Sequence, residues 1–369
     1  MDLRQDVLPV LRPLGGEEES NALKEVIESG WWGKGKKVSE LEEKFAKLVG
    51  AKHAIAVTSN THGLDLVLKA KGIEHCDVIS PTMSFATTAM APLWNNCTST
   101  LVDVKEDDLC IDPDDVKQKL KTNTKAVIAV NMAGVPADID SIRNIFDGFV
   151  IEDCAHSCYT SGAGSKGDVA IWSFQAVKTM PCGDGGMITT NDTALYEKLV
   201  PMSWMGISST HERTKNIDGR PGYSWDYDIK MIGTKSYMID IMAAICLEQF
   251  KKLESNLAIR RGIQNYYNNV LPNQVQRPVW TNTVQHYGAR VEATVRDKLI
   301  DYLASKKIHT SVHYKPLHLH TLFKGKYSLP VAEREWQKLI SLPCHPAMNE
   351  DDMAYVAHWI KEYYNEHSL

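Results

Sequence analysis

From residue 16 to residue 200, short runs of apolar and β-branched residues alternate with stretches in which apolar residues recur every three or four positions. The short runs predict strands buried on both faces of a sheet, and the periodic stretches predict the helices that cover it. This order favours an α/β domain with a seven-stranded, mostly parallel sheet. The expected strands are residues 54–57, 77–80, 100–104, 126–130, 148–151, 169–174 and 187–190, and the expected helices are 16–29, 37–49, 61–70 and 139–145.

The rest of the chain has a different pattern. Residues 203–235 lose the periodicity and are rich in Gly, Ser, Trp and charged residues, which predicts a functional loop or a subunit contact. Because 369 residues exceed the size at which one core keeps growing, we expect a large domain at 1–250 and a small α+β domain at 251–369. The elements expected after the loop are a helix at 239–271, a strand at 284–293, a helix at 296–306, a strand at 310–314 and a helix at 351–364.

Charge and composition narrow the classes of partner. The 41 basic and 46 acidic side chains give a formal charge of -5, which offers no electrostatic reason to expect nucleic acid or an anionic membrane as partner. The longest apolar stretch, at 126–135, falls short of the roughly 20 residues that cross a bilayer. The acidic and polar start of the chain is unlike a signal peptide. We therefore expect a cytoplasmic protein that acts on small molecules.

The eight cysteines fit this location, since in a reducing compartment they are more often buried small residues than disulfides. Cys154 and Cys158 are the only close pair with a suggestive gap. No second pair and no histidine pair completes a zinc set, so we predict no metal site.

The first candidate for a catalytic residue is Lys178. It lies 25 residues after Asp153, and Asp153 stands at the end of a predicted strand. A lysine held in a pocket can lose its proton and form a Schiff base with a carbonyl. Pyridoxal phosphate (PLP) requires such a lysine, and it also requires an acidic partner for its pyridine nitrogen. Asp153 stands where ligands bind in open α/β sheets. Its spacing to Lys178 therefore favours a PLP site over an ordinary turn.

Two further segments predict a phosphate cradle for this cofactor. Ser173 lies at the end of the strand 169–174, close to Lys178, and a loop with three glycines at 183–186 allows the backbone to approach a ligand. The segment 57–62 runs from a strand into a helix whose N–H groups and dipole favour an anion. Each feature taken alone is also typical of an ordinary cap.

In their order along the chain, these motifs closely resemble the DegT/DnrJ-type sugar aminotransferases, which are fold-type I PLP enzymes that act on nucleotide-linked keto sugars. The resemblance covers nearly the whole chain. It implies a homodimer, because the family's cofactor sites are completed across a two-fold interface. The matching segments are 151–156, 167–178 and 183–187, together with 58–61, 81–87, 111–113, 124–128, 233–244, 313–318 and 342–343.

The resemblance implies a role for each candidate residue of the cofactor site. Lys178 anchors the cofactor and Asp153 pairs with its pyridine nitrogen. Phe85 stacks on the ring and His156 lies near the ring's 3-hydroxyl, although residues of these types are more often plain core. The cofactor phosphate is held by hydroxyls and backbone groups of Ser173, Ser59, Asn60 and Thr61.

Three positions depart from the family pattern. Asn60 replaces the usual glycine of the phosphate turn, which is tolerable because asparagine accepts left-handed backbone geometry better than most residues. Where the family commonly has an asparagine or arginine that reaches the neighbouring subunit's phosphate, either Lys235 or Tyr237 could supply the contact. Asn131 replaces a common histidine, and we attach no consequence to it.

The reaction implied by the resemblance has two halves. An amino acid, expected to be L-glutamate, gives its amino group to the cofactor, and a nucleotide-linked keto sugar then collects it, while the released Lys178 moves the proton. We expect amination at C4 of an NDP-4-keto-6-deoxyhexose, with C3 amination as the alternative. Trp32, His313, His318 and the loop at 203–235 are expected to line the substrate cleft, although a structural role stays open for the tryptophan and for both histidines.

Two other functions are less well supported by the sequence. Some relatives carry histidine in place of the anchoring lysine and dehydrate the sugar, but Lys178 argues against that chemistry. A PLP-binding regulatory relative without turnover is the other alternative. No added DNA-binding or signalling domain is recognisable, and every chemical position is filled, so an enzyme is the better prediction.

Overall fold

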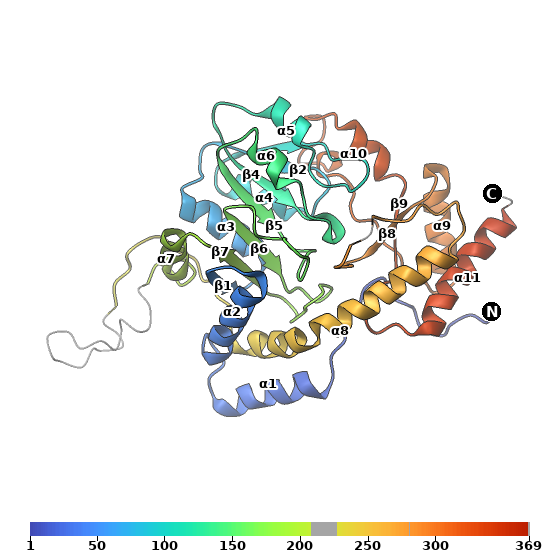
Figure 1. The fold of residues 1–369 in the computed structure, drawn as a ribbon, viewed down its shortest axis with the longest axis horizontal. Coiled ribbons are helices and arrows are strands. Elements are labelled where there is room, and N and C mark those ends of the chain that lie inside the picture. Colours follow the sequence, from blue (N-terminus) through green and yellow to red (C-terminus); the bar gives the residue numbers. More distant parts are fainter. Residues whose placement is uncertain (208–226, 280, 368–369) are drawn as a thin grey trace.

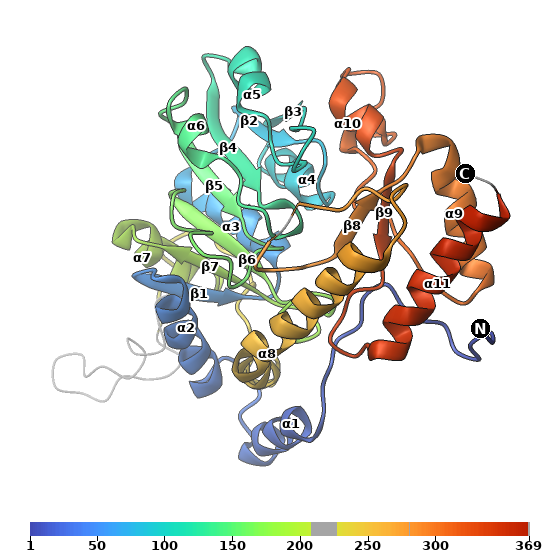
Figure 2. The ribbon, with the colours of Figure 1, turned by 45° about the vertical axis from the view of Figure 1, so that its right-hand side comes forward.

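The computed structural model describes residues 1–207, 227–279 and 281–367, which form a larger and a smaller part side by side (Figure 1). The larger part contains a seven-stranded sheet and the smaller part a two-stranded sheet packed against helices (Figure 2). The predicted fold class is confirmed. The strands of the large sheet are β1 (His53–Val57), β2 (Asp77–Pro81), β3 (Thr98–Val102), β4 (Thr124–Val130), β5 (Phe149–Asp153), β6 (Val169–Ser173) and β7 (Gly186–Thr190).

All seven strands lie within two residues of their predicted positions, and their order is β1-β7-β6-β5-β4-β2-β3. The pairs from β3 through β2, β4 and β5 to β6 are parallel, whereas β7 runs antiparallel to both of its neighbours. The parallel strands therefore place their carboxyl ends along one edge of the sheet. That edge carries the candidate chemistry.

Helices cover both faces of this sheet because alternate side chains of each strand point to opposite sides. In β1, Ile55 and Val57 pack with α3 and α7, whereas Ala54 and Ala56 pack with α2 and α8. The predicted helices α1, α2, α3 and α6 are confirmed, as is the long helix α8. Their bounds are α1 (Glu17–Ser29), α2 (Lys36–Val49), α3 (Asn60–Lys71), α6 (Ile139–Arg143), α7 (Thr193–Met202) and α8 (Asp240–Val270).

The sequence pattern missed four helices. Three are α5 (Pro113–Lys119), α7 and α10 (Pro330–Glu335), none of which the sequence pattern singled out. The fourth, α4 (Thr87–Trp94), is apolar nearly all round and contains Pro92, so its sequence gives no amphipathic signal.

The smaller part is built on β8 (Tyr287–Arg290) and β9 (Leu339–Leu342), which pair antiparallel and are covered by α9 (Ala293–Ser305) and α11 (Glu350–Glu366). The strand expected at 310–314 does not form. Ser311 makes a single bridge with Ser341, and the chain then leaves the sheet. This departure carries the following side chains toward the candidate site.

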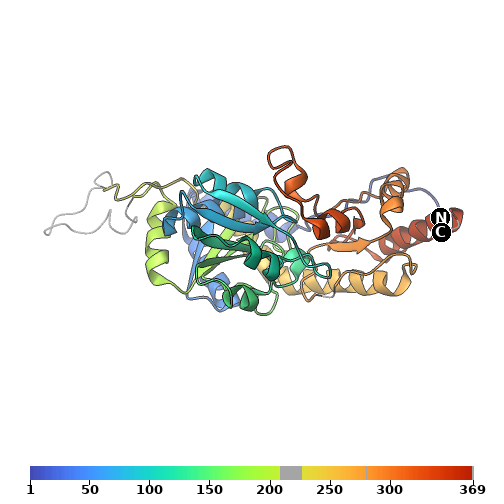
Figure 3. The same cartoon turned by 90° about the horizontal axis from the view of Figure 1, so that it is seen from above.

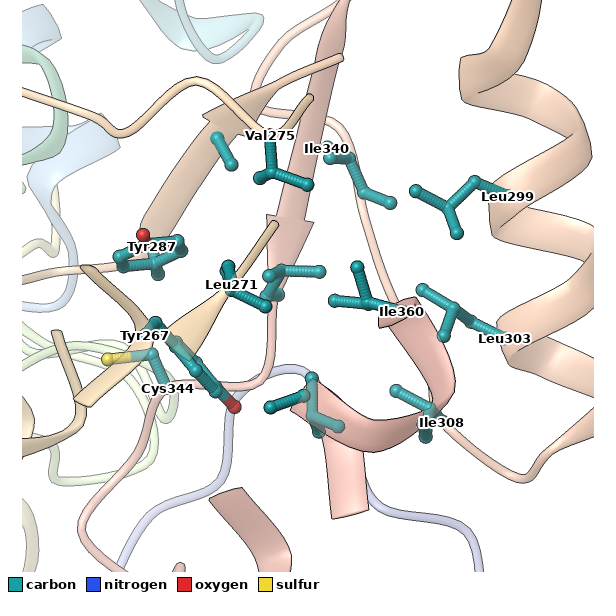
Figure 4. Close-up of a cluster of buried hydrophobic side chains, with 14 of the residues drawn as sticks. Tyr267, Leu271, Val275, Tyr287, Leu299, Leu303, Ile308, Ile340, Cys344 and Ile360 are labelled. Atoms are coloured by element: carbon teal, nitrogen blue, oxygen red, sulfur yellow. The ribbon is translucent and has the colours of Figure 1, made fainter. Parts of the chain in front are cut away.

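Helix α8 connects the two parts, as the view from above shows (Figure 3). Its first half, from Ala243 to Leu257, contributes to the core under the large sheet, and its second half contributes Ile263 and Tyr267 to the core of the smaller part. Figure 4 shows Tyr267 within that second core. The domain boundary expected between 250 and 251 therefore falls inside one continuous helix.

The first residues of the chain belong to the smaller part. Leu8, near the start of the sequence, pairs with Ile308 and belongs to the core of the smaller part, so it does not pack with the large sheet.

All eight cysteines are buried thiols. Across residues 1–207, 227–279 and 281–367, no helix is both long and apolar enough to cross a membrane.

A buried carboxylate fixes the loop between β5 and β6. Glu152 is 2% exposed, and its side chain accepts hydrogen bonds from the backbone N–H groups of Gly164 at 2.9 Å, Lys166 at 2.7 Å and Gly167 at 2.6 Å. Three donors on one carboxylate anchor the loop directly beside Asp153. The end of β5 therefore has little freedom to move.

We predict that Glu152→Ala lowers the free energy of unfolding by about 3 kcal/mol, because three backbone donors lose a charged acceptor in a buried place. Urea denaturation measures this loss through the transition midpoint. The matched control is Glu197→Ala, which removes an exposed glutamate from α7 and should leave the midpoint in place. Equal midpoints for the two variants would refute the anchoring role.

Candidate active site

The candidate site begins at the ends of β5 and β6. Asp153 is the last residue of β5 and Ser173 the last residue of β6, and the parallel register pairs Asp153 with Ile171. After β6 the chain makes a tight loop, in which the N–H of Cys182 donates to the carbonyl of Phe174 at 2.8 Å. This loop returns Lys178 toward the two strand ends. The structure thus brings the three principal predicted residues to one edge of the sheet.

The amino group of Lys178 lies in a desolvated environment, although the residue as a whole remains partly accessible. Burial lowers the pKa of Lys178 to about 8, and the negative charge of Asp153 opposes that shift. A lysine with an ordinary pKa is almost wholly protonated at neutral pH. Lys178 therefore supplies a larger fraction of neutral amine near neutral pH than an ordinary lysine does, and a nucleophile or proton carrier needs this form.

Asp153 is buried and meets several donors. Its Oδ1 accepts hydrogen bonds from the Asn60 side-chain amide at 2.9 Å and from the backbone N–H of Ala155 at 3.1 Å. Burial raises the pKa of Asp153 overall, and these hydrogen bonds, the charge of Lys178 and the Thr88 side chain offset only part of that rise. The donors therefore oppose the cost of burying a carboxylate charge.

The two segments of the predicted phosphate cradle, the end of β6 and the turn after β1, lie on either side of β7. Gly186 is paired with Val57 on one side and with Ser173 on the other, so the turn after β1 and the end of β6 flank it. A Cβ on Gly186 would lie 2.6 Å from the backbone nitrogen of Asn60, which explains why glycine is needed at this contact. Ser173 and the residues that follow Val57 are thereby brought to the same edge.

Within the cradle, the hydroxyls are held by neighbouring polar groups. Ser59 caps α3 by accepting from the backbone N–H of His62 at 3.1 Å, and the Thr58 hydroxyl lies 2.7 Å from Nδ1 of His62. The Thr61 hydroxyl lies 2.9 Å from that of Thr87, at the first residue of α4. The starts of α3 and α4 are thus joined by hydroxyl groups beside the candidate phosphate position.

The structure gives Asn60 a different geometry from the one expected. Its φ is not in the left-handed region, because Asn60 is the first residue of α3 and follows the N-cap Ser59. Tolerance of left-handed geometry is therefore not the reason that asparagine fits here. Its side chain points instead to Asp153, as its hydrogen bond shows.

The remaining predicted cofactor residues have contrasting environments. Phe85 is 64% exposed, so its ring is accessible to a ligand. His156 is buried, with Nε2 3.1 Å from the Tyr314 hydroxyl and Nδ1 accepting from the N–H of Ala133 at 3.4 Å. Tyr237 is buried against Trp204, with 4.3 Å between the ring centroids.

The three predicted substrate residues do not lie together. Trp32 is 54% exposed on the surface before α2. His313 lies near the lysine, with its Nδ1 2.8 Å from the Ser341 hydroxyl. His318 is buried elsewhere, with its ring nitrogens 2.7 Å from the Thr82 hydroxyl and 3.1 Å from Glu333, a setting that suits a structural histidine. The loop predicted as a cleft wall falls mainly on 208–226, outside the described residues.

Sequence reasoning missed His286 and Gln285, which come from the smaller part. The His286 ring stacks on His313 with 4.5 Å between centroids and meets the edge of His156 at 5.5 Å. The Gln285 amide donates to the carbonyl of Val177 at 2.9 Å, one residue before the lysine. No local motif marks either residue, because both reach the site through the packing of distant segments.

These histidines are neutral near physiological pH. Burial holds the pKa of His156 and of His286 well below the usual value, and the charge of Lys178 acts in the same direction. Burial likewise lowers the pKa of His313 to about 4. A neutral imidazole offers one donor and one acceptor, so the cluster adds hydrogen-bonding groups to the site without adding charge.

The arrangement fits PLP. A lysine with a lowered pKa lies near a buried carboxylate, hydroxyl groups gather at two helix starts, and an aromatic ring is exposed nearby. These are the groups that the aldehyde, the ring nitrogen, the phosphate and the ring face of PLP would need. Among the residues that the structure describes, no three His, Cys, Asp or Glu side chains are grouped to hold a metal ion.

Comparisons with known proteins agree with this fit. The spore coat polysaccharide biosynthesis protein SpsC of Bacillus subtilis (strain 168) is 34% identical over an alignment of 383 positions, which covers 97% of each chain. Spr1654 of Streptococcus pneumoniae, solved in a PMP form and a PLP form, is 25% identical. Its PMP form has a TM-score of 0.90, and the match covers 97% of this chain and 99% of that chain. Its PLP form has a TM-score of 0.88, and the match covers 98% of this chain and 99% of that chain.

A third structure is that of DesI in the presence of its TDP-sugar product. It is 25% identical, has a TM-score of 0.86, and is matched over 99% of this chain and 96% of the other. The model of the DegT/DnrJ/EryC1/StrS aminotransferase family matches residues 13–361. This chain belongs to that family, and it is a PLP-dependent sugar aminotransferase.

Proposed function

We propose that the protein transfers the amino group of L-glutamate to C4 of an NDP-4-keto-6-deoxyhexose. The observation that carries the transfer chemistry is the desolvated amino group of Lys178, with its pKa lowered to about 8, close to the buried carboxylate of Asp153. DesI, which was solved with a TDP-sugar product, supports a nucleotide-linked sugar as acceptor. SpsC, named for polysaccharide biosynthesis, supports a sugar as the class of substrate.

Lys178 has two tasks in this proposal. PLP, when bound, supplies a carbonyl for the lysine and an electron-accepting ring that stabilises negative charge next to the reacting carbon. Lys178 first anchors it, and after release its neutral amine takes the proton from the carbon of the amino donor. The lowered pKa suits this task, because a general base works best when its pKa lies near the working pH.

Asp153 and the neutral histidines have complementary tasks. Asp153 would hold the ring nitrogen in its protonated form, since a carboxylate favours a nearby positive charge. His313 is held through its Nδ1 by the Ser341 hydroxyl and would hydrogen-bond the sugar. Because its imidazole is neutral, it would add no positive charge beside Lys178. His156, bonded to Tyr314, would lie near the ring's 3-hydroxyl.

We further propose a homodimer. A groove of about 1280 Å³ lies between α1, α2 and the segment after α7, and it is lined by aromatic residues that include Trp31, Trp204 and Tyr237. Trp31 and Trp32 are 62% and 54% exposed. Large exposed aromatic residues gathered near a groove are typical of an interaction surface.

The proposed reaction is tested by incubating the PLP-loaded protein with L-glutamate and a panel of NDP-4-keto-6-deoxy and NDP-3-keto sugars. We expect glutamate to convert the bound cofactor to its amine form, which absorption shows, and one 4-keto sugar to gain an amino group, which mass spectrometry shows. Glutamate that leaves the spectrum unchanged would contradict the choice of donor. A product from a 3-keto sugar alone would contradict the C4 assignment.

Two lysine variants serve as controls for this assay. Lys178→Ala should bind PLP without a covalent link, so that borohydride does not fix the cofactor, and it should show no amino transfer above background. Lys198→Ala removes an exposed lysine of α7 and should behave like the unchanged protein. Turnover that persists in Lys178→Ala would refute the role of the lysine.

We predict that the rate of covalent PLP attachment to the apoprotein rises with pH through about 8 and then levels, because only the neutral amine reacts. An ordinary lysine would keep gaining rate up to about pH 10. Since Asp153 favours the protonated lysine, Asp153→Asn should move the midpoint to a lower pH. Stopped-flow absorbance measures both profiles, and a midpoint above pH 10 would contradict the assignment.

The dimer is tested by light scattering on the loaded protein. We expect a mass of twice the 41.3 kDa of one chain. Trp31→Glu should lower that mass toward one chain, because a charge in the groove opposes association. A single-chain mass for the unchanged protein at micromolar concentration would refute the dimer.

A further inference from the structure

Asn60 connects the start of α3 to the strand that carries the candidate acid. Its side-chain Nδ2 donates to Oδ1 of Asp153 at 2.9 Å and to the backbone carbonyl of Ile171 at 3.3 Å. Asp153 and Ile171 face each other in the parallel register of β5 and β6. The amide of Asn60 therefore reaches across two neighbouring strands at the position where Asp153 ends β5.

The two partners fix which way this amide points. One partner is a carboxylate oxygen and the other a carbonyl oxygen, and both can only accept. The NH₂ group must therefore face them, because the amide oxygen would meet two acceptors in the flipped orientation. With both N–H groups engaged, the side chain of Asn60 is held in one orientation against Asp153.

This contact bears directly on the charge of Asp153. Burial raises the pKa of that carboxyl overall, and the hydrogen bonds from Ala155 and Asn60, the charge of Lys178 and the Thr88 side chain act against burial. The hydrogen bonds from Asn60 and Ala155 both end on Oδ1. Both bonds stabilise the ionised carboxylate.

The side chain of Asn60 can be changed without loss of the turn that carries it. Ser59 caps α3 through the N–H of His62, and the N–H of Thr58 donates to the carbonyl of Ser236 at 2.7 Å. The backbone at Asn60 also packs directly on Gly186. These contacts involve backbone atoms or other side chains, so a substitution at Asn60 tests its amide alone.

We propose that Asn60 is a positioning residue that acts through Asp153, holding this carboxylate ionised and oriented so that it keeps the ring nitrogen of PLP protonated. This inference rests on the role proposed above for Asp153. Asn60 thereby acts on the electronic state of the cofactor ring, in addition to any contact that its backbone makes with the phosphate.

The test uses the full chain loaded with PLP that carries ¹⁵N at the ring nitrogen, followed by NMR over a range of pH. In Asn60→Ala, the ring nitrogen should lose its proton at least about one pH unit lower than in the unchanged protein, a tenfold shift in the equilibrium. The kcat for amino transfer should fall about tenfold with little change in KM. Asn60→Leu, which keeps the shape of the side chain without its donors, should behave in the same way.

Two controls separate this inference from its basis. Asp153→Asn should change the ¹⁵N titration strongly, and Asn365→Ala, in an exposed part of α11, should not change it. If Asp153→Asn changes the titration while both Asn60 variants titrate like the unchanged protein, the role of Asn60 is refuted and that of Asp153 stands. If Asp153→Asn also has no effect, both roles fail. Thermal unfolding confirms that each variant is folded.

Discussion

The parallel pairing of β5 with β6 is the constraint on which the site depends. Because the register sets Asp153 opposite Ile171, Ser173 extends two residues beyond Asp153 along the same edge. The antiparallel β7 then places Gly186 between Ser173 and the end of β1, which adds the start of α3 to that edge. Because of the order of the strands, Asp153, the candidate phosphate ligands and the loop that carries Lys178 lie at the same edge of the sheet. A one-residue slip of β6 would turn its side chains to the opposite face and break the arrangement.

Bringing a lysine and a carboxylate together in a buried site has opposing effects on each. Burial alone penalises both charges, which lowers the pKa of Lys178 and raises that of Asp153, whereas their mutual attraction acts in the opposite direction. Asp153 also accepts hydrogen bonds from Asn60 and Ala155, which stabilise its ionised form. This stabilisation suits the proposed chemistry, in which the acid stays charged and the lysine becomes neutral. Neutral imidazoles around the pair leave this balance undisturbed.

The sequence was most informative where the pattern is local. Continuous apolar runs such as 126–130 located the buried strands, and the order of motifs placed Asp153, Ser173 and Lys178 at one edge. It was least informative where contacts join distant segments. The amide of Asn60 meets Asp153 across 93 residues, and Gln285 reaches Val177 across 108, so no spacing rule reveals either contact. The alternating pattern at 310–314 resembles a strand, but only Ser311 finds a partner there. His318 shows the same limit, because its burial between Thr82 and Glu333 depends on packing.

Helix α8 holds segments of the smaller part in contact with the loop that carries Lys178. Its Arg260 is buried, and its guanidinium donates to the carbonyls of Gln285 at 2.8 Å and Cys344 at 2.9 Å, which lie on the segments before β8 and after β9. Gln285 in turn bonds to the carbonyl beside Lys178. A buried guanidinium is costly to leave without acceptors, so these segments are held to α8. Since the same helix packs under the large sheet, the position of Gln285 relative to the lysine loop is fixed by one continuous element. The active site is thus assembled from both parts of the chain, and its geometry depends on α8 remaining unbroken between them.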